Sequence, residues 1–137
     1  MAMSDAAVRA TLQEHGIAVT KPRLVIGGLV LSCPQHLTAE RVWERLLDAG
    51  ARVSKATVYN TLNLFAQKGV LRQLNVDPAV TWFDSNTQPH FHFQHVDSGE
   101  LVDVQCDGLT LTSLLDLPPG TESVGIDLVI RIRQKAV

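Results

Sequence analysis

Two histidines in the second half of the chain, His90 and His92, have a spacing that lets both bind one metal ion. They lie in the segment His90–His95, which alternates polar and apolar residues and predicts a strand. Residues two apart in a strand point to one face, roughly 7 Å apart, so the two imidazoles project together. Asp103, on the next expected strand, can face them, and Asp84 lies shortly before the segment. This donor set suits Fe(II), Mn(II) or Zn(II).

The same residues are compatible with other interpretations, which the sequence leaves open. A His-x-His pair also occurs on ordinary solvated strands. His36, alone in a loop between expected helices, favours a structural role by itself, and His95 falls on the opposite face of its strand. Two His and one carboxylate are also the ligands of non-haem Fe(II) oxygenases, so a small non-haem metalloenzyme is the alternative function. Such enzymes usually build their site in a barrel of many strands, which this chain is too poor in strands to form.

A second candidate site is the stretch Arg52–Gly69, which predicts a helix that Ser54 can cap. Its apolar stripe consists of Val58, Leu62 and Phe65. Its polar side carries Lys55, Tyr59, Asn60 and Asn63. In a DNA major groove, Lys binds phosphate, Asn pairs with adenine and a Tyr ring rests on a thymine methyl group. The stretch therefore predicts a DNA-reading helix, although an ordinary surface helix has a similar polar face.

The residues around that stretch predict further helices and a hairpin. We expect helices over Ala6–His15, Thr20–Leu31 and Thr38–Asp48, and strands over Val70–Leu74 and Val80–Phe83. The segment Cys33–His36 is a break. The pair Gly27–Gly28 costs roughly 1 kcal/mol of helix propensity per glycine, which close approach of another helix would explain. Helices that close on a hairpin form the winged helix-turn-helix.

The period of the apolar residues changes to two after Ser85–Pro89, which is typical of a linker. We expect strands over His90–His95, Glu100–Val104 and Val124–Ile132, and a weak helix over Gly108–Leu117. The predicted fold is therefore α+β. It comprises a winged helix-turn-helix domain over residues 1–84, a hinge over 85–89 and a small α/β dimerisation and metal-sensing domain over 90–137. A sheet of three strands is thin for independent stability, so pairing of two copies would bury its exposed face.

Composition excludes several classes of protein. No apolar run approaches the roughly 20 residues that span a bilayer, and the N-terminus does not have the pattern of a secretion signal. Cys33 and Cys106 are far apart, which argues against a disulfide framework or a Cys-rich zinc site. We therefore expect a cytoplasmic protein with no membrane partner.

Charge is distributed unevenly along the 137 residues. Residues 1–76 contain nine Lys or Arg and five acids, whereas residues 77–137 contain three and nine. A basic half followed by an acidic half indicates an anionic partner, such as DNA, for the first and a cation for the second. Chance variation between the halves also produces such a difference.

Taken together, these residues resemble the ferric uptake regulator (Fur) superfamily. The matching motifs are Gly16–Arg23, His36–Glu40, Ser54–Tyr59, Phe83–Asp84, His90–His92 and Leu101–Asp103. Within the superfamily the chain looks most like the iron response regulator (Irr) branch, because it has Val58-Tyr-Asn60, a short ending and no Cys-x-x-Cys pair. The resemblance implies a homodimeric, non-enzymatic transcription regulator of iron homeostasis that binds a palindromic double-stranded DNA operator.

The resemblance also implies which residues form the sites. The regulatory metal site would be His36, Asp84, His90, His92 and Asp103. The DNA face would be Lys55, Thr57, Tyr59 and Asn60, with Arg23 on phosphate. Divalent Fe, Mn or Zn at the hinge would fix the angle between the two domains.

Two departures from the family pattern bear on the cofactors. Zinc-bearing members have Cys where this chain has His95 and Ser98, so no structural zinc site built from four cysteines is expected. Irr-like proteins often have three consecutive His implicated in haem sensing, and here Phe91 replaces the middle one. The candidate haem ligands are Cys33, His90 and His92, although a helix-breaking turn explains Cys33-Pro34 better.

Overall fold

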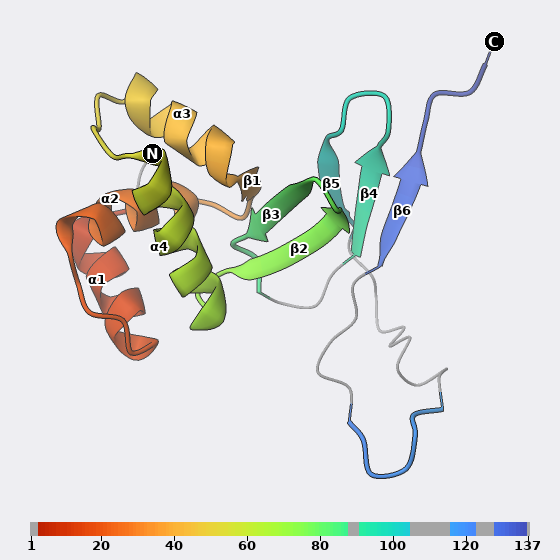
Figure 1. Cartoon of the computed structure of the whole chain (residues 1–137), viewed down its shortest axis with the longest axis horizontal. Coiled ribbons are helices and arrows are strands. Elements are labelled where there is room, and N and C mark those ends of the chain that lie inside the picture. Colours follow the sequence, from red (N-terminus) through yellow and green to blue (C-terminus); the bar gives the residue numbers. More distant parts are fainter. Residues whose placement is uncertain (1–2, 88–90, 105–115, 123–127, 137) are drawn as a thin grey trace. The chain divides into compact units, whose positions relative to one another are not determined.

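The chain forms two compact units, residues 1–87 and 88–137, each of which is described here by itself. The computed structural model describes residues 3–87, 91–104, 116–122 and 128–136. Among these described residues, helices dominate the first unit and strands the second (Figure 1), so the predicted α+β fold class is confirmed. Within the described ranges, every helix is too short or too polar to cross a membrane.

The described part of the first unit contains four helices and three strands. These are α1 (Asp5–Glu14), α2 (Lys21–Val30), β1 (His36–Thr38), α3 (Ala39–Asp48), α4 (Lys55–Gln67), β2 (Arg72–Asp77) and β3 (Val80–Asp84). A Ser or Thr hydroxyl caps each helix by accepting a backbone N–H three residues further on, as at Ser4, Thr20, Thr38 and Ser54. Figure 1 shows the helices grouped together and the β2–β3 hairpin extending from them. This arrangement is the predicted winged helix-turn-helix.

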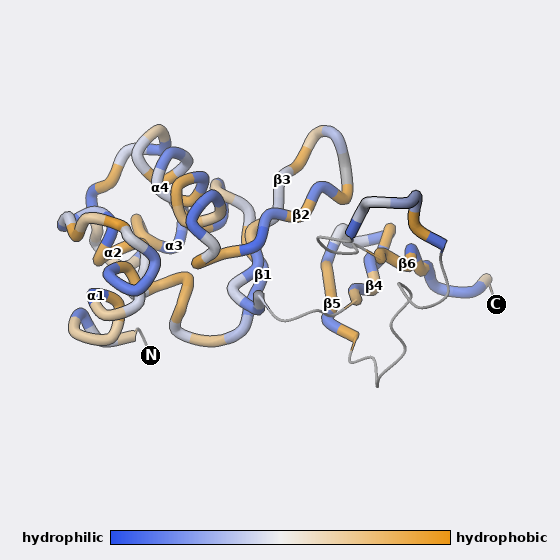
Figure 2. Tube along the Cα trace, turned by 90° about the horizontal axis from the view of Figure 1, so that it is seen from below, coloured by the Kyte–Doolittle hydropathy of each residue, from blue (hydrophilic) through white to orange (hydrophobic). Residues whose placement is uncertain are grey.

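The core of the first unit lies between the helices. Figure 2 shows hydrophobic and hydrophilic residues interleaved along them, as expected for helices that bury one side. Val58, Leu62 and Phe65, the predicted apolar stripe of α4, are all fully buried, as are Val8 and Leu12 of α1. Burial of the stripe leaves the polar side of α4 at the surface.

The two adjacent glycines of α2 have a packing reason. A Cβ atom on Gly27 would lie 2.5 Å from Cγ1 of Val8 on α1, which is closer than any such contact can be. At Gly28, the backbone N–H of Met3 donates to the carbonyl oxygen at 3.0 Å. The predicted close approach of a second helix is therefore confirmed, and that helix is α1.

The strands of the first unit differ from the prediction in two places. The sequence predicted no strand before α3, but β1 pairs antiparallel with β3 and gives the sheet the order β1-β3-β2. The first strand of the hairpin was predicted over Val70–Leu74, whereas β2 begins at Arg72 and continues to Asp77. It begins late because the N–H of Val70 donates to the carbonyl of Phe65, which completes the end of α4.

The second unit is a three-stranded sheet in its described residues. It contains β4 (Phe91–His95), β5 (Leu101–Val104) and β6 (Val129–Ile132), in the order β5-β4-β6. β4 is antiparallel to β5 and parallel to β6. The predicted strands are confirmed where they are described. His90, most of the predicted helix Gly108–Leu117 and the first residues of the predicted strand Val124–Ile132 lie outside the described residues.

The register of this sheet separates its two faces. His92 pairs with Asp103 on one side and with Val129 on the other, while Phe93 pairs with Val102 and Ile130. Because successive residues of a strand point to opposite faces, the polar pair and the apolar row lie on opposite faces. Val102 and Ile130 are 46% and 44% exposed.

Candidate metal centre and nucleic-acid interface

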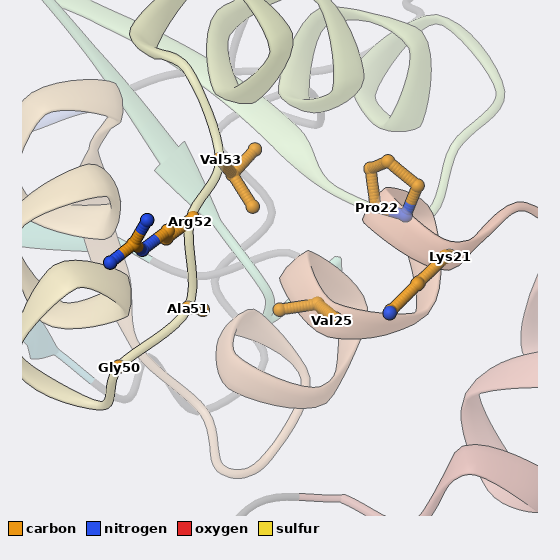
Figure 3. A pocket seen from close by; sticks show the side chains of 7 residues that line it. All are labelled: Lys21, Pro22, Val25, Gly50, Ala51, Arg52 and Val53. Atoms are coloured by element: carbon orange, nitrogen blue, oxygen red, sulfur yellow. The ribbon is translucent and has the colours of Figure 1, made fainter.

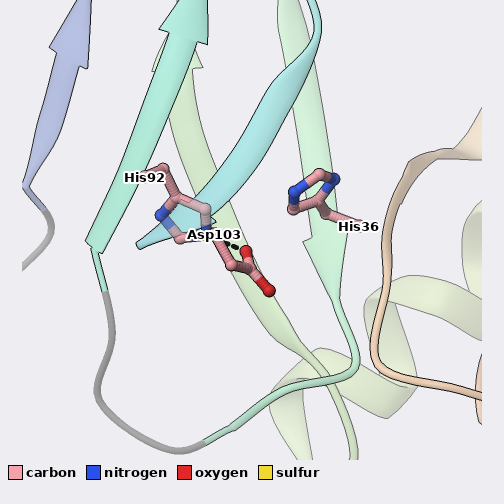
Figure 4. Close-up of side chains that lie close together, drawn as sticks. All are labelled: His36, His92 and Asp103. Carbon is pink, nitrogen blue, oxygen red and sulfur yellow. Dashed lines mark ion pairs between the residues drawn. The ribbon is translucent and has the colours of Figure 1, made fainter. Parts of the chain in front are cut away.

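The second unit brings together two of the predicted metal ligands. His92 on β4 and Asp103 on β5 are direct cross-strand partners. Their side chains point toward each other in Figure 4, and His92 Nε2 lies 3.3 Å from Asp103 Oδ1. The imidazole is buried, with 2% of its surface exposed. Asp103 therefore faces His92, as the sequence predicted.

The geometry of this pair fits a divalent metal ion. Nitrogen and oxygen ligands lie about 2.0–2.2 Å from a tetrahedral zinc ion, so two of its ligands are about 3.3–3.6 Å apart. The 3.3 Å between His92 Nε2 and Asp103 Oδ1 lies within that range. An imidazole with a carboxylate also matches the chemistry of Fe(II), Mn(II) and Zn(II). Both atoms can therefore bind one such ion with little rearrangement.

The first unit contains a corresponding pair, His36 and Asp84. They face each other in the register of β1 and β3, and Asp84 is fully buried. Its Oδ1 accepts the backbone N–H of Asn86 at 2.9 Å. The ring of His36, also drawn in Figure 4, stands edge-on to that of Trp82, with centroids 6.0 Å apart and planes at 83°. Each unit thus supplies one imidazole and one carboxylate from neighbouring strands.

The residues next to His36 and Asp84 connect this pair to the helices. Three hydrogen bonds join Gln35 and Ser85. The Gln35 N–H donates to Ser85 Oγ at 2.9 Å, and the Ser85 N–H and hydroxyl donate to the Gln35 carbonyl at 2.9 and 3.1 Å. The Gln35 side chain also donates to the carbonyl of Leu29 in α2 and accepts from Arg45 of α3. These bonds connect β1 and the end of β3 to both α2 and α3.

Sequence reasoning did not predict that His36 faces Asp84. The signal was the run His36-Leu-Thr38, in which Leu37 is buried between two less buried neighbours. Three residues are too few to reveal a strand by periodicity. Of the predicted metal and haem residues, His90 lies outside the described residues, and Cys33 is exposed in the loop after α2.

The candidate DNA-reading residues of α4 differ in how much they are exposed. Tyr59 is 48% exposed and Asn60 is also exposed, both on the side of the helix away from its buried stripe. The side chains of a rigid helix are well suited to contact base edges. These two residues are therefore accessible to a major groove.

Lys55, at the start of α4, lies against α3. Its Nζ is 4.5 Å from the centre of the Trp43 ring and 3.8 Å from Oε1 of Glu40. The indole N–H of Trp43 in turn donates to the carbonyl of Val53 at 3.1 Å. The lysine remains 60% exposed, so it can leave these partners for a phosphate at small energetic cost.

The other two predicted DNA residues have partners within the chain. Thr57 Oγ1 accepts from Ser54 Oγ at 2.9 Å, so both hydroxyls belong to the cap of α4. The Arg23 guanidinium donates to the carbonyl of Ala18 at 2.7 Å. These bonds orient the first turns of α4 and α2.

Comparison with known proteins relates this geometry to a family. The sequence profile of the Ferric uptake regulator family matches residues 14–113. The peroxide-responsive repressor PerR of Staphylococcus aureus is 32% identical over 96 residues, which are 70% of this chain and 65% of the repressor. The match thus spans slightly less than two thirds of that relative.

Solved structures agree with the sequence match. The ferric uptake regulator of Pseudomonas aeruginosa, solved with manganese, has a TM-score of 0.74 at 29% identity, covering 94% of this chain and 98% of that one. The regulator of Vibrio cholerae has a TM-score of 0.71 at 26% identity, covering 92% and 98%. On the profile match over most of its length and on these structures, the chain belongs to the Ferric uptake regulator family.

Proposed function

We propose that this protein is a DNA-binding transcription regulator whose DNA affinity is controlled by a divalent metal ion. The observation that supports this most strongly is the presence of one facing His–Asp pair in each unit, His36 with Asp84 and His92 with Asp103. The carboxylate of Asp84 is fully buried, and burial of a carboxylate is costly unless a cation or hydrogen bonds balance its charge. The relatives are named as repressors and regulators, which supports the same function.

The mechanism that we propose couples the ion to the arrangement of the two units. One ion would take ligands from both pairs and from His90, at a hinge near residues 85–89. An ion can shift a conformational equilibrium only by its difference in affinity for the two states. An ion that needs ligands from both units binds one arrangement much more tightly than the others. The spacing of the reading helices in a dimer would then depend on the ion.

The proposed dimer uses the apolar face of the second unit. Phe93, Val102 and Ile130 form a row across the three strands on the face opposite His92. A second copy that covers this row would bury apolar surface, which contributes about 25 cal/mol per Å². Two copies related by a two-fold axis would also present two α4 helices to a palindromic operator.

We propose an iron-responsive protein of the Irr-like branch, located in the cytoplasm, with Fe(II), Mn(II) or Zn(II) at the site. Haem is the competing ligand. The buried position of His92 and the carboxylate 3.3 Å from its Nε2 favour a small ion over a haem iron.

The proposal is tested by selecting bound DNA from a random pool, with Fe(II), Mn(II) or haem and without added ligand. We expect a palindromic sequence to be enriched, to an extent that depends on one of the metal ions. If the enrichment depends on haem and on neither metal ion, the regulatory ligand is haem. A metalloenzyme would enrich no DNA sequence and would instead convert an oxidisable substrate, which overturns the proposal.

A further inference from the structure

A pocket of about 440 Å³ lies in the first unit, between the first turns of α2 and the loop that leads from α3 into α4 (Figure 3). Its lining consists of Lys21, Pro22, Val25, Gly50, Ala51, Arg52 and Val53. Two of these residues are cationic and the other five are apolar or glycine. The pocket therefore combines an apolar floor with positive charge.

The two cations of the pocket point in different directions. In Figure 3 the Lys21 side chain extends toward the Gly50–Val53 loop, with its ammonium group at the pocket, while the Arg52 guanidinium points away from it. Pro22, Val25 and Val53 present their side chains to the space between these segments. Lys21 is thus the cation of this pocket, and Arg52 contributes mainly its backbone.

This combination fits the sugar–phosphate backbone of nucleic acid. A phosphodiester is a monoanion that a lysine ammonium binds as a point charge, and the deoxyribose next to it has a largely apolar C–H surface. Because α2 begins at Lys21, the partial positive charge of its N-terminus adds to that of the ammonium group. An open pocket with one cation and an apolar floor can take one phosphate and its neighbouring sugar.

The position of the pocket relative to α4 supports the same occupant. Val53 is two residues before Lys55, the first residue of α4, and Tyr59 and Asn60 lie within the next two turns. At 1.5 Å per residue, these two residues are only about 6–8 Å along the axis from the helix start. A strand whose bases contact Tyr59 and Asn60 therefore has its backbone near this end of the helix.

We propose that Lys21 binds a backbone phosphate of the DNA and that the adjoining deoxyribose packs on Pro22, Val25 and Val53. The proposal depends on the DNA-binding function proposed above and adds a contact that sets the register of α4 on the duplex. Arg23, which the sequence analysis placed on phosphate, already donates to the carbonyl of Ala18. Lys21 is the cation of this turn that faces the pocket.

The test combines the removal of one phosphate charge from the DNA with the removal of one side-chain charge from the protein. In the DNA that the selection yields, each phosphate in turn is replaced by an uncharged methylphosphonate, and the affinity of three proteins is measured. These are the wild type, Lys21→Ala and the control Arg52→Ala, which removes the same charge from a side chain that points away from the pocket. At one position per half-site, we expect the methylphosphonate to weaken DNA binding by the wild type and by Arg52→Ala severalfold. At the same position it should leave the DNA affinity of Lys21→Ala almost unchanged.

A second measurement checks the nature of the contact. Lys21→Ala should lower the slope of log affinity against log salt by about 0.9 and leave the preferred sequence unchanged, as expected for one lost phosphate contact. If the variant and the wild type unfold at the same temperature, the change in DNA affinity is not caused by loss of folding. Lys21→Gln replaces Lys21→Ala in these measurements if Lys21→Ala does not fold.

Equal losses at every position for all three proteins would overturn the phosphate contact while leaving DNA binding intact. Failure of the wild type to select any DNA would instead overturn the function on which the contact depends.

Discussion

At the scale of single residues, the proposed metal site depends on the distance between His92 and Asp103. An Nε2–Oδ1 separation of 3.3 Å is long for a charge-assisted hydrogen bond but suits two ligands of one ion. Asp103→Asn keeps the shape of the side chain and removes its charge. We expect calorimetry to show at least about tenfold weaker binding of Mn(II), since even partners that only orient a ligand are worth 10–100-fold.

Asp116→Asn is the matched control, because it removes the charge of an exposed aspartate of the same unit. It should bind Mn(II) as the wild type does. For the wild type, binding should also weaken as the solution is acidified, because an imidazole must be neutral to bind a metal. Equal affinities for wild type and Asp103→Asn would show that this carboxylate is not a ligand.

Glu40 offers a second prediction at this scale. Its Oε1 lies 3.8 Å from Lys55 Nζ, so it competes with DNA phosphates for that lysine and repels them. Glu40→Gln should strengthen DNA binding by roughly two- to fivefold at moderate salt, with a steeper salt dependence. Glu44→Gln, on the next turn of α3, is the control and should change affinity less. If the DNA affinity of Glu40→Gln equals that of the wild type, Lys55 stays in contact with the Trp43 ring in the DNA complex and does not bind a phosphate.

At the scale of elements, the contact between α1 and α2 is tight at Gly27. A methyl group there would meet Cγ1 of Val8, whose β-branched side chain has one preferred rotamer in a helix and cannot move aside easily. Overpacking of this kind costs about 1–3 kcal/mol. Gly27→Ala should therefore unfold at lower urea concentration than Gly28→Ala, whose added Cβ would meet nothing closer than 3.4 Å.

Both substitutions gain about the same helix propensity, so the difference between the two variants isolates the contact with Val8. Equal midpoints for the two variants would mean that α1 can shift away from α2 without cost.

The elements also show how far the sequence determines the structure. Hydroxyl caps and the stripe Val58, Leu62 and Phe65 predicted α4 correctly, because a helix of 13 residues repeats its pattern several times. The three residues of β1 repeat nothing, and their conformation depends on pairing with β3, some 45 residues later. The pocket at Lys21 was missed for the same reason, since α2 and the loop before α4 meet only in the tertiary structure.

At the scale of the whole molecule, the apolar row of the second unit predicts the oligomeric state. Val102→Glu should weaken the dimer by at least about tenfold, because a two-fold interface would bury the unpaired carboxylate twice. Light scattering coupled to gel filtration measures the mass. Val96→Glu is the control, since Val96 is equally exposed, at 49%, but lies in the turn after β4. A Val102→Glu protein that remains dimeric would place the interface elsewhere.

We expect the ion that binds Asp103 also to control DNA binding. The most direct measurement is the anisotropy of labelled operator during Mn(II) titration of the wild type and of Asp103→Asn. Occupancy of the site follows its Mn(II) affinity, so the Mn(II) concentration that changes the DNA affinity should be higher for the variant than for the wild type by the factor by which its Mn(II) affinity falls. A wild-type DNA affinity that is the same with and without the ion, or the same response to Mn(II) in both proteins, would show that this site does not control DNA binding.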